Sequence, residues 1–457
     1  MIGRIGRIPD RATSNFGNRW VGLSLMLFAM AVSGPLHHPL GDQAASRYAL
    51  TGAVWDDQSV VIDGYLVGRD RAVANNRTYS DKAPGQPFWG VLPYGLYRAF
   101  GGQPAKEPQI HRNWGLWLVT IWSSVVPAAV LMWLMWWGSN RSSEDAWAVI
   151  IVWSGTLLLP MSSLLFGHLL STTLLYSAFV ILRKPCTFQH ILGAGALAGL
   201  AVVTEYTAAI GVLVLLVWQL RRNKRRAGWF ALGGLPPAMA LATYNTAAFG
   251  APWLLSYQFN AFNAVTEEAR PLFEMFSTAT WSNIAELFFG GRGLLIATPI
   301  VAVGFWGLWR LRDDRPQGDA ASIGLWMCLL FLLLPIFWGN PWGGDSPGPR
   351  YMAPCLPFLA MGVAHGLRRI PIFTVSAAVV SSGTMLLASL TNPVGLSGRS
   401  SGGLPFWIDL AREGQLAPTT FDSLIAPPVA SGVHLVAVAV TCCLFTVAER
   451  GIRPVYT

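Results

Sequence analysis

Charged residues are scarce in this sequence. Only 12% of the 457 residues are Asp, Glu, Lys or Arg, whereas soluble domains usually contain about 25%. Hydrophobic residues make up 53% of the chain, and the mean hydropathy is +0.44. This composition excludes an ordinary soluble enzyme and predicts an integral membrane protein with many spans.

Cysteine pairs and familiar catalytic motifs are also missing. The five cysteines form no plausible pair in the expected outer loops and no C-x-x-C motif, so the fold is not expected to depend on disulfides. The chain has no Walker A lysine loop, no G-x-S-x-G and no H-E-x-x-H. ATP-driven pumping, serine hydrolysis and zinc proteolysis are therefore disfavoured.

Long apolar runs dominate what is present. A spanning helix needs roughly 20 mostly apolar residues. The shortest pair of runs is separated by Glu205. About twelve segments qualify, and they predict an all-α polytopic membrane protein: 19–36, 113–137, 146–162, 165–182, 190–203, 206–220, 228–248, 293–309, 321–338, 351–367, 371–390 and 432–448.

Basic residues gather in the short loops between these runs. With the N-terminus in the cytoplasm, the cytoplasmic segments hold most of them, which is the positive-inside pattern. This pattern places both termini inside and accounts for the net charge of +9 through topology and membrane lipids, without nucleic acid. The clearest members are Arg4, Arg7, Arg11, Arg19, Arg221–Arg226, Arg310, Arg312, Arg315, Arg368 and Arg369.

Three long polar stretches, 41–112, 250–291 and 391–430, all fall on the opposite, extracytoplasmic side. We therefore expect a single membrane-embedded unit, 1–457, that works on that face. Within the first stretch, the segments Asp42–Val54 and Pro87–Phe100 are expected to form interfacial helices along the membrane. A re-entrant or tilted helix is the alternative for the second.

The first loop contains the motif R-T-Y-S-D-K-A-P-G (Arg77–Gly85). Lys82, with Asp81 beside it, could bind a lipid-linked phosphate or form an ordinary surface pair. Asp42 follows the first apolar run and could act as a general base or as a helix N-cap. Asp63, which precedes Gly64, could accept a substrate hydroxyl or be a turn residue.

Further polar residues stand out elsewhere. Asp56 and Asp57 form a solvated turn or help to bind a divalent metal ion. Glu205 and His168 lie at outer helix ends, where an ionisable group is costly, and they either line a cavity or are satisfied by neighbours. Arg350, followed by Tyr351, could clamp a phosphate or anchor the membrane interface.

These motifs together resemble the polytopic GT-C glycosyltransferases, particularly bacterial relatives of protein O-mannosyltransferases and lipid A aminoarabinose transferases. In that group a carboxylate follows the first helix, then an Arg-Tyr, then an acid-Lys-Pro-Pro motif. The resemblance covers about residues 20–370. The corresponding residues here are Asp42, Arg47-Tyr48 and Asp81-Lys82-Ala83-Pro84, followed by F-G-H (Phe166–His168), G-L-A-V-V-T-E-Y (Gly199–Tyr206), Y-N-T-A-A-F-G-A-P (Tyr244–Pro252) and G-P-R-Y-M-A-P (Gly348–Pro354).

The resemblance implies a helical membrane bundle in the bacterial inner membrane with an extracytoplasmic active site. It implies transfer of a hexose or pentose, with inversion, from a polyprenyl-phosphate donor to an envelope glycan, lipid or protein. Asp42 would be the base, and Lys82 and Arg350 would hold the donor phosphate. Metal use differs between members of the family, so a divalent ion stays open.

The sequence departs from the family pattern at one point. The usual carboxylate lies three residues before the arginine, whereas Asp42 lies five before Arg47. On a helix these spacings point in different directions. Either the segment is not helical, or Asp63 or Asp57 is the base, or catalysis is altered in this chain.

Two other functions remain open from the sequence. A transporter or flippase of lipid-linked substrates would use Glu205 and the arginines along a path, but it would be expected to show inverted repeats. A structural subunit of an envelope-assembly complex would tolerate replacement of Asp42, Asp63 and Lys82.

Overall fold

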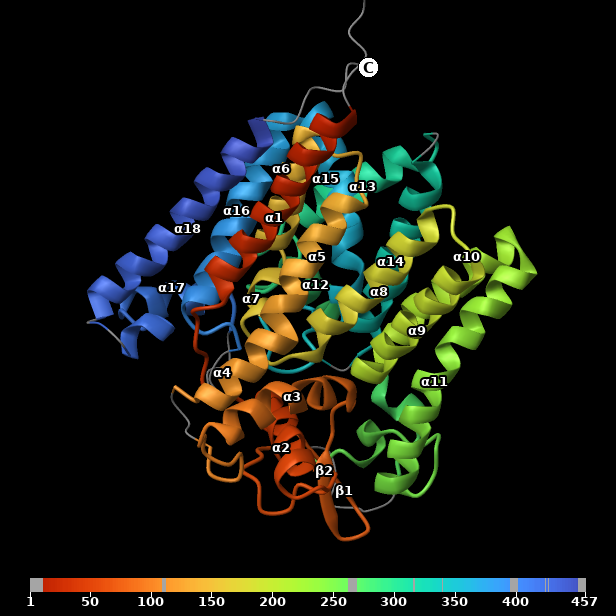
Figure 1. The fold of residues 1–457 in the computed structure, drawn as a ribbon, viewed down its shortest axis with the longest axis vertical. Helices are drawn as coiled ribbons and strands as arrows, with labels where there is room; N and C mark the ends of the chain where they lie inside the picture. The colour runs from red at the N-terminus through yellow and green to blue at the C-terminus, as the bar shows by residue number, and fades with distance from the viewer. Residues whose placement is uncertain are drawn as a thin grey trace, which may run out of the picture.

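The computed structural model describes residues 11–108, 112–261, 269–314, 317–338, 340–394, 402–423, 425 and 427–450. This part of the chain is mostly helical (Figure 1). Its elements are α1 (Arg11–Ser33), α2 (Asp42–Asp56), β1 (Arg71–Ala74), β2 (Arg77–Ser80), α3 (Gly85–Ala99), α4 (Trp114–Thr120), the π-helical turn η1 (Ile121–Val125), α5 (Val126–Trp137), α6 (Ser143–Ser154), α7 (Leu158–Ser162), α8 (Gly167–Arg183), α9 (Phe188–Thr204), η2 (Tyr206–Ala208), α10 (Ala209–Arg222), α11 (Lys224–Phe249), η3 (Ser256–Phe259), η4 (Leu272–Met275), α12 (Trp281–Phe289), α13 (Ile300–Leu311), α14 (Gly318–Phe337), η5 (Arg350–Phe358), α15 (Leu359–Arg369), α16 (Pro371–Leu390), α17 (Leu404–Arg412), η6 (Thr420–Ser423) and α18 (Pro427–Arg450).

Each apolar segment predicted from the sequence contains a helix. Glu205 separates α9 from η2 and α10, as the sequence indicated, and its backbone is extended there. Among the described residues, four helical stretches are long and apolar enough to cross a membrane. They are Trp114–Trp137, Gly318–Phe337, Pro371–Leu390 and Val429–Arg450, and the full number of spans stays a prediction.

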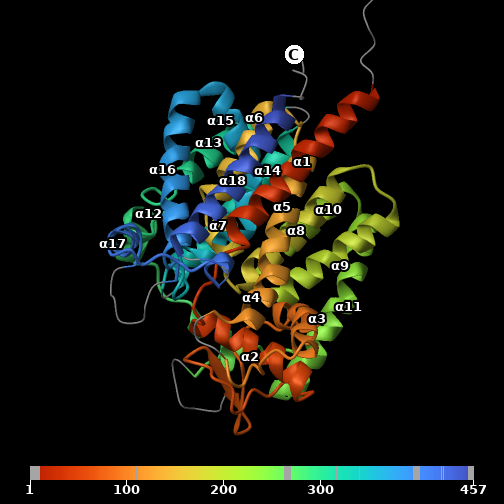
Figure 2. The ribbon, with the colours of Figure 1, turned by 60° about the vertical axis from the view of Figure 1, so that its left-hand side comes forward.

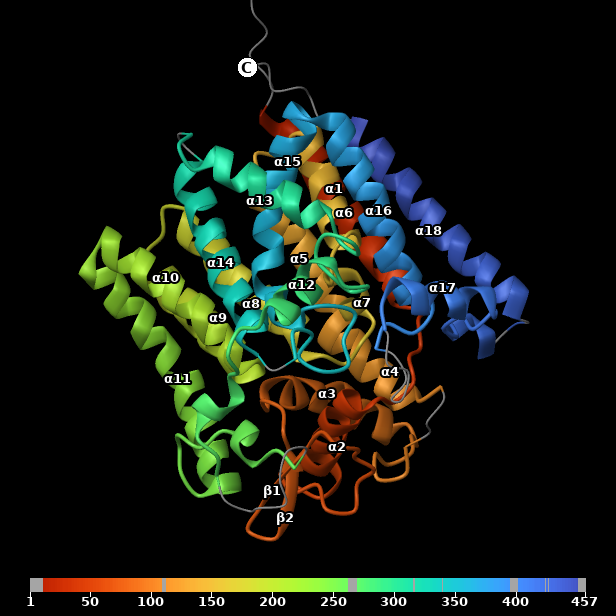
Figure 3. The ribbon, with the colours of Figure 1, turned by 180° about the vertical axis from the view of Figure 1, so that it is seen from behind.

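The helices form a bundle with two different ends. At one end, which we call the capped end, α2, α3, β1 and β2 fold over the bundle (Figures 1 and 2). The start of α1 and the end of α18 lie at the opposite end, which we call the termini end. Seen from behind, the chain that follows α11 reaches the capped end beside the strands (Figure 3).

A two-stranded antiparallel hairpin lies in the first long loop, which the sequence-based expectation of an all-α chain did not include. Arg71 pairs with Ser80, and the turn residues Asn75 and Asn76 both have positive φ, 52° and 56°. A two-residue turn with both φ positive matches the twist of the strands, and Asn tolerates it. The loop after α11 joins the hairpin, because the N–H of Ala261 donates to the carbonyl of Arg71 at 2.9 Å.

Helix α2 forms where the sequence predicted a helix, and its position at the membrane interface stays a prediction. Every residue from Gln43 to Ala53 is buried, so protein surrounds the middle of the helix, whereas Asp42 and Trp55 at its ends are exposed. Tyr48 packs edge-on against Tyr94 of α3, with ring centres 5.5 Å apart. Together with the hairpin and the end of α11, these residues form a second hydrophobic core within the cap.

Helix α3 has an apolar surface that other described residues leave uncovered. Phe88, Trp89, Leu92 and Leu96 are exposed, whereas Gln86 and the other residues of the opposite face are buried. Such a surface fits a helix that touches lipid. Its interfacial position stays a prediction.

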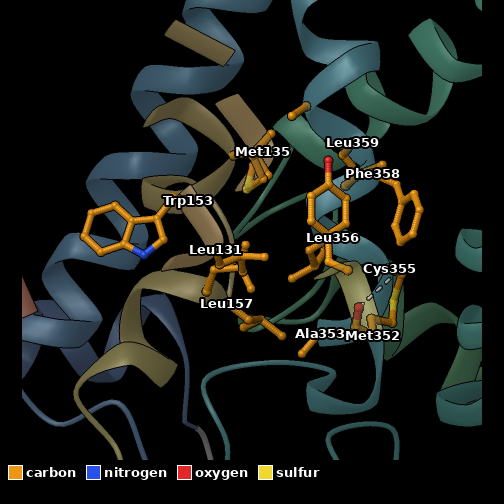
Figure 4. Packing of buried hydrophobic residues seen from close by; sticks show 14 of the residues in the cluster. Leu131, Met135, Trp153, Leu157, Met352, Ala353, Cys355, Leu356, Phe358 and Leu359 are labelled. Atoms are coloured by element: carbon orange, nitrogen blue, oxygen red, sulfur yellow. Dashed lines mark hydrogen bonds between the residues drawn. The ribbon is translucent and has the colours of Figure 1, made fainter. Parts of the chain in front are cut away.

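The main hydrophobic core fills the bundle and fixes the segment η5 (Figure 4). Leu131 and Met135 of α5 and Trp153 of α6 belong to the same core as Met352 and Phe358, and in Figure 4 Leu131 and Leu157 lie between Trp153 and Leu356. Pro354 and Pro357 lack the N–H that an α-helix would use, and the segment adopts the tighter 3₁₀ form before α15 begins. This packing holds Arg350 at the start of η5.

Close backbone contact joins α9 to α11. A Cβ atom on Gly195 would collide with the carbonyl oxygen of Phe230, whereas a Cβ on Gly193 would meet nothing within 4 Å. Small residues that let two backbones approach are typical of helix pairs in membranes.

This contact gives a stability prediction. Gly195→Ala is expected to destabilise the protein by about 1–3 kcal/mol, because the added methyl overpacks the α9–α11 contact. Gly193→Ala, in the same helix, should be neutral or stabilising by up to about 1 kcal/mol. Thermal unfolding of the detergent-purified protein would measure both. Equal effects of the two variants would contradict the contact.

Candidate active site

Lys82 lies at the centre of a buried charged cluster at the capped end. It follows β2 and precedes α3, and its Nζ lies 2.8 Å from Asp81 Oδ2 and 3.0 Å from Asp70 Oδ2. The side chain of Lys82 is only 6% exposed. Gly85 begins α3 so close to Thr204 that a Cβ would come within 2.8 Å of its backbone nitrogen. The turn is therefore fixed against the end of α9.

Asp81 binds two distant segments, α2 and the chain at η3. Its carboxylate accepts hydrogen bonds from Ser46 of α2 at 3.2 Å and from Asn260 Nδ2 at 2.7 Å. Its backbone carbonyl accepts a hydrogen bond from the hydroxyl of Ser256 at 2.9 Å. The carboxylate is thus held in one orientation and paired with Lys82.

A second buried ion pair lies at the break after α9. Arg47 Nη2 lies 2.6 Å from Glu205 Oε1, and each side chain is only 1% exposed. Arg47 also donates to Gln43 Oε1 at 3.0 Å. His168, at the start of α8, has its Nδ1 3.4 Å from the same oxygen of Glu205. The expected polar residues at these helix ends are therefore brought together.

Arg350 is buried but incompletely paired. Among the described residues its Nε and Nη1 atoms have no hydrogen-bond partner. Gly343 and Gly344, with φ of +73° and +106°, pass beside the guanidinium. The ring of Tyr351 lies 5.4 Å from the guanidinium carbon and 6.0 Å from the ring of His168, measured to ring centres.

The charges of these residues act on one another. Burial alone would raise the pKa of Asp70, but the positive charges of Lys82 and Arg350 hold it below its ordinary value. Burial raises the pKa of Asp345, and the negative charges of Asp42 and Asp70 raise it further. The charges of Asp42, Asp70 and Arg350 therefore all act on Asp345, and those of Lys82 and Arg350 act on Asp70.

Asp42 lies at the exposed start of α2. Its Oδ2 accepts a long hydrogen bond, 3.4 Å, from the backbone N–H of Arg69, and its carboxylate packs against Gly68. The segment that carries Asp42 and Arg47 is helical, so the first explanation for the five-residue spacing does not apply. Asp42 and Arg47 point in different directions because five residues span about 500° of an α-helix.

Other candidates from the first loop have local partners. Asp63 Oδ1 accepts the N–H of Thr78 at 2.8 Å, which braces the hairpin. Asp57, at the far end of α2, accepts a hydrogen bond from Tyr65 and pairs with Lys106 at 2.8 Å. The hydrogen bond from Lys106 holds the pKa of Asp57 below its ordinary value.

The sequence left open whether the chain binds a divalent metal ion. Within the described ranges, no three His, Cys, Asp or Glu side chains are grouped so as to hold a metal ion. Asp56, the neighbour of Asp57, pairs with Arg98 at 2.8 Å and accepts a hydrogen bond from Tyr94.

Sequence reasoning missed two members of the cluster, Asp70 and Asn260. Asp70 was one acid among several in a polar loop, and it reaches Lys82 because the loop returns along the hairpin. Asn260 lies 179 residues from Asp81. No local spacing in the sequence could have indicated that contact.

No protein-family model and no curated protein matches the chain. Solved structures do resemble it. ArnT from Cupriavidus metallidurans, solved bound to undecaprenyl phosphate and in the apo state, aligns with a TM-score of 0.52 and 14% identity over 96% of this chain and 76% of that chain. The archaeal oligosaccharyltransferase AglB from Archaeoglobus fulgidus, solved with an inhibitory peptide and a dolichol-phosphate, aligns with a TM-score of 0.52 and 11% identity over 96% of this chain and 56% of that chain.

At these identities the likeness concerns the fold. It extends over nearly the whole chain and confirms, at the level of fold, the resemblance to GT-C membrane glycosyltransferases. The roles of individual residues rest on the contacts described above.

Proposed function

We propose that this chain, which has the GT-C fold, is a glycosyltransferase that moves a sugar from a polyprenyl-phosphate donor to a cell-envelope acceptor. It would act at the outer face of a bacterial plasma membrane, with the capped end outside and the termini inside. The acceptor would be a glycan, lipid or protein.

The observation that carries this proposal is the incompletely paired Arg350. A buried arginine without partners for two of its nitrogens is costly unless a ligand supplies the acceptors. A phosphate does so well, because its oxygens match the fork of the guanidinium. Lys82, within the same electrostatic environment, would add a second cation.

The surroundings suit a donor with a lipid tail. Helix α3 begins three residues after Lys82 and exposes Phe88, Trp89 and Leu92. A polyprenyl chain would lie along this apolar surface while its phosphate reaches the buried cations. The solved neighbours ArnT and AglB were obtained with undecaprenyl phosphate and dolichol-phosphate respectively, which supports this class of ligand.

We assign the general base to Asp42. In the proposed step its carboxylate takes the proton of the acceptor hydroxyl, and the hydroxyl oxygen attacks the anomeric carbon from the side opposite the phosphate. The bond from that carbon to the phosphate oxygen breaks, and the configuration inverts. Lys82 and Arg350 offset the negative charge that develops on the departing phosphate. Asp63 and Asp57 are less suited to act as the base. The carboxylate of Asp63 braces the hairpin, and that of Asp57 pairs with Lys106.

The proposal predicts different results for two aspartates. Asp42→Asn is expected to lower sugar transfer by about 100-fold or more, because a general base contributes roughly that much, while donor binding stays unchanged. Asp63→Asn is the matched control and should keep most activity. The measurement is transfer of labelled sugar from a polyprenyl-phosphate lipid fraction to an envelope fraction by the purified protein.

Other outcomes would change the residue that we assign as the base, or the function that we propose. If Asp63→Asn, and not Asp42→Asn, loses transfer, the base lies at the hairpin. If the wild-type protein binds the donor but never transfers sugar to any envelope fraction, it is a carrier or flippase of lipid-linked substrates. A protein that neither binds nor transfers would fit a structural subunit.

A further inference from the structure

A cluster of positive charge lies at the termini end, far from Lys82. Arg141 belongs to the loop between α5 and α6. Arg183 is the last residue of α8, and Lys184 follows it. Helix α5 packs along α8, so the two loops meet at the indole ring of Trp137. The guanidinium carbon of Arg141 lies 4.2 Å from the centre of that ring, and Lys184 Nζ lies 4.7 Å from it.

No described acid neutralises this cluster. Arg141, Arg183 and Lys184 have no carboxylate within ion-pair distance in the part of the chain that the structure describes. Arg183 Nη1 donates instead to the neutral carbonyl of Gly138. Burial lowers the pKa of Lys184, and the charges of Arg141 and Arg183 lower it further. Cations held this close repel one another unless an anion lies between them.

The backbone at Arg141 is also strained. Its φ is +62°, in the left-handed region that non-glycine residues seldom adopt. The turn is held by the N–H of Arg141, which donates to the hydroxyl of Ser139 at 3.0 Å. Strain of this kind persists only where the surrounding structure holds the residue in place, and it is common at functional sites. Here it places the guanidinium over Trp137.

We propose that Trp137, Arg141, Arg183 and Lys184 bind a phosphate group, and that this group belongs to the headgroup of an anionic phospholipid. Guanidinium groups present paired donors to phosphate oxygens, and the lysine adds a point charge. Tryptophan is common at membrane interfaces. Basic pockets between membrane helices on the cytoplasmic side bind anionic headgroups, and the positive-inside pattern puts this end there.

Native mass spectrometry of the full chain in detergent tests the proposal with phosphatidylglycerol and phosphatidylcholine as probes. The wild-type protein should retain one phosphatidylglycerol in preference to phosphatidylcholine. Arg141→Gly should lower that retention about tenfold, because it removes one of the charge-assisted contacts. It should not lower the unfolding temperature without lipid, since glycine relieves the positive φ. A merely misfolded variant would lose both.

The matched control is the double variant Lys224→Gln/Arg225→Gln. It removes two exposed basic residues at the same end of the bundle, beyond this cluster. Equal loss of lipid in the control and in Lys184→Gln would overturn the site in favour of general surface charge. Displacement of the lipid by millimolar inorganic phosphate would support the phosphate site and overturn its assignment to a lipid.

Discussion

Arg350→Met is expected to reduce sugar transfer by about 100- to 1,000-fold, the effect of removing one well-placed donor from a developing negative charge. The fold should survive, because Nε and Nη1 of Arg350 have no hydrogen-bond partner among the described residues and the substitution removes only a small part of the packing, the guanidinium beside Tyr351. The apparent affinity for the polyprenyl-phosphate donor should fall as well. Rates of transfer and donor binding by the purified variant measure both effects.

Two comparisons make this result interpretable. Arg77→Met removes an exposed arginine from β2 at the same end of the molecule and should leave transfer unchanged. Lys82→Met should lose transfer and also stability, because it leaves the carboxylates of Asp81 and Asp70 without their cation. Normal transfer by Arg350→Met would contradict the phosphate clamp. A large loss of stability in Arg350→Met would mean that Arg350 has a structural role.

Glu205→Leu is expected to lower the free energy of unfolding by about 3–5 kcal/mol, because it strands Arg47 as a buried, unpaired charge. Both side chains are only 1% exposed, so water cannot replace the lost partner. The double variant Arg47→Met/Glu205→Leu should recover much of that loss, since no charge then remains buried. Thermal unfolding of the wild type, Arg47→Met, Glu205→Leu and the double variant in one detergent gives the coupling energy.

An exposed ion pair provides the control for Glu205. Arg222 and Asp319 lie 2.9 Å apart, but their side chains are 36% and 68% exposed. Asp319→Ala should therefore cost no more than about 1 kcal/mol. If Glu205→Leu costs no more than Asp319→Ala, the α9 break is hydrated and the pair does not stabilise the site.

Most of the helices could be predicted from the sequence, because they depend on residues that lie close together along the chain. Apolar runs of helix length are visible in the sequence, and Glu205 marked the break between α9 and α10 correctly. The motif around Lys82 was also visible, since its Asp81 partner is the adjacent residue. Whether Lys82 binds phosphate stays a prediction.

The parts that the sequence did not indicate depend on contacts across the chain. The composition of α2 did not indicate how deeply its middle is buried, which follows from packing against α3 and β2. Asp70 and Asn260 join the cluster through loops whose paths no local pattern reveals. The five-residue spacing between Asp42 and Arg47 is visible in the sequence. Which explanation of the spacing applies depends on whether the segment is helical, and α2 is helical.

The contact between Asp81 and Asn260 has a consequence for how the protein is made. Asn260 leaves the ribosome 179 residues after Asp81, which at bacterial rates of about 5–20 residues per second takes about 9–36 s. During that time Asp81 and the hairpin lack the hydrogen bonds that Ser256, Asn260 and Ala261 later supply. Until Asn260 is synthesised, the charged side chains of the first long loop stay hydrated. Interruption of synthesis before Asn260 should therefore leave it open to proteases that the finished protein resists.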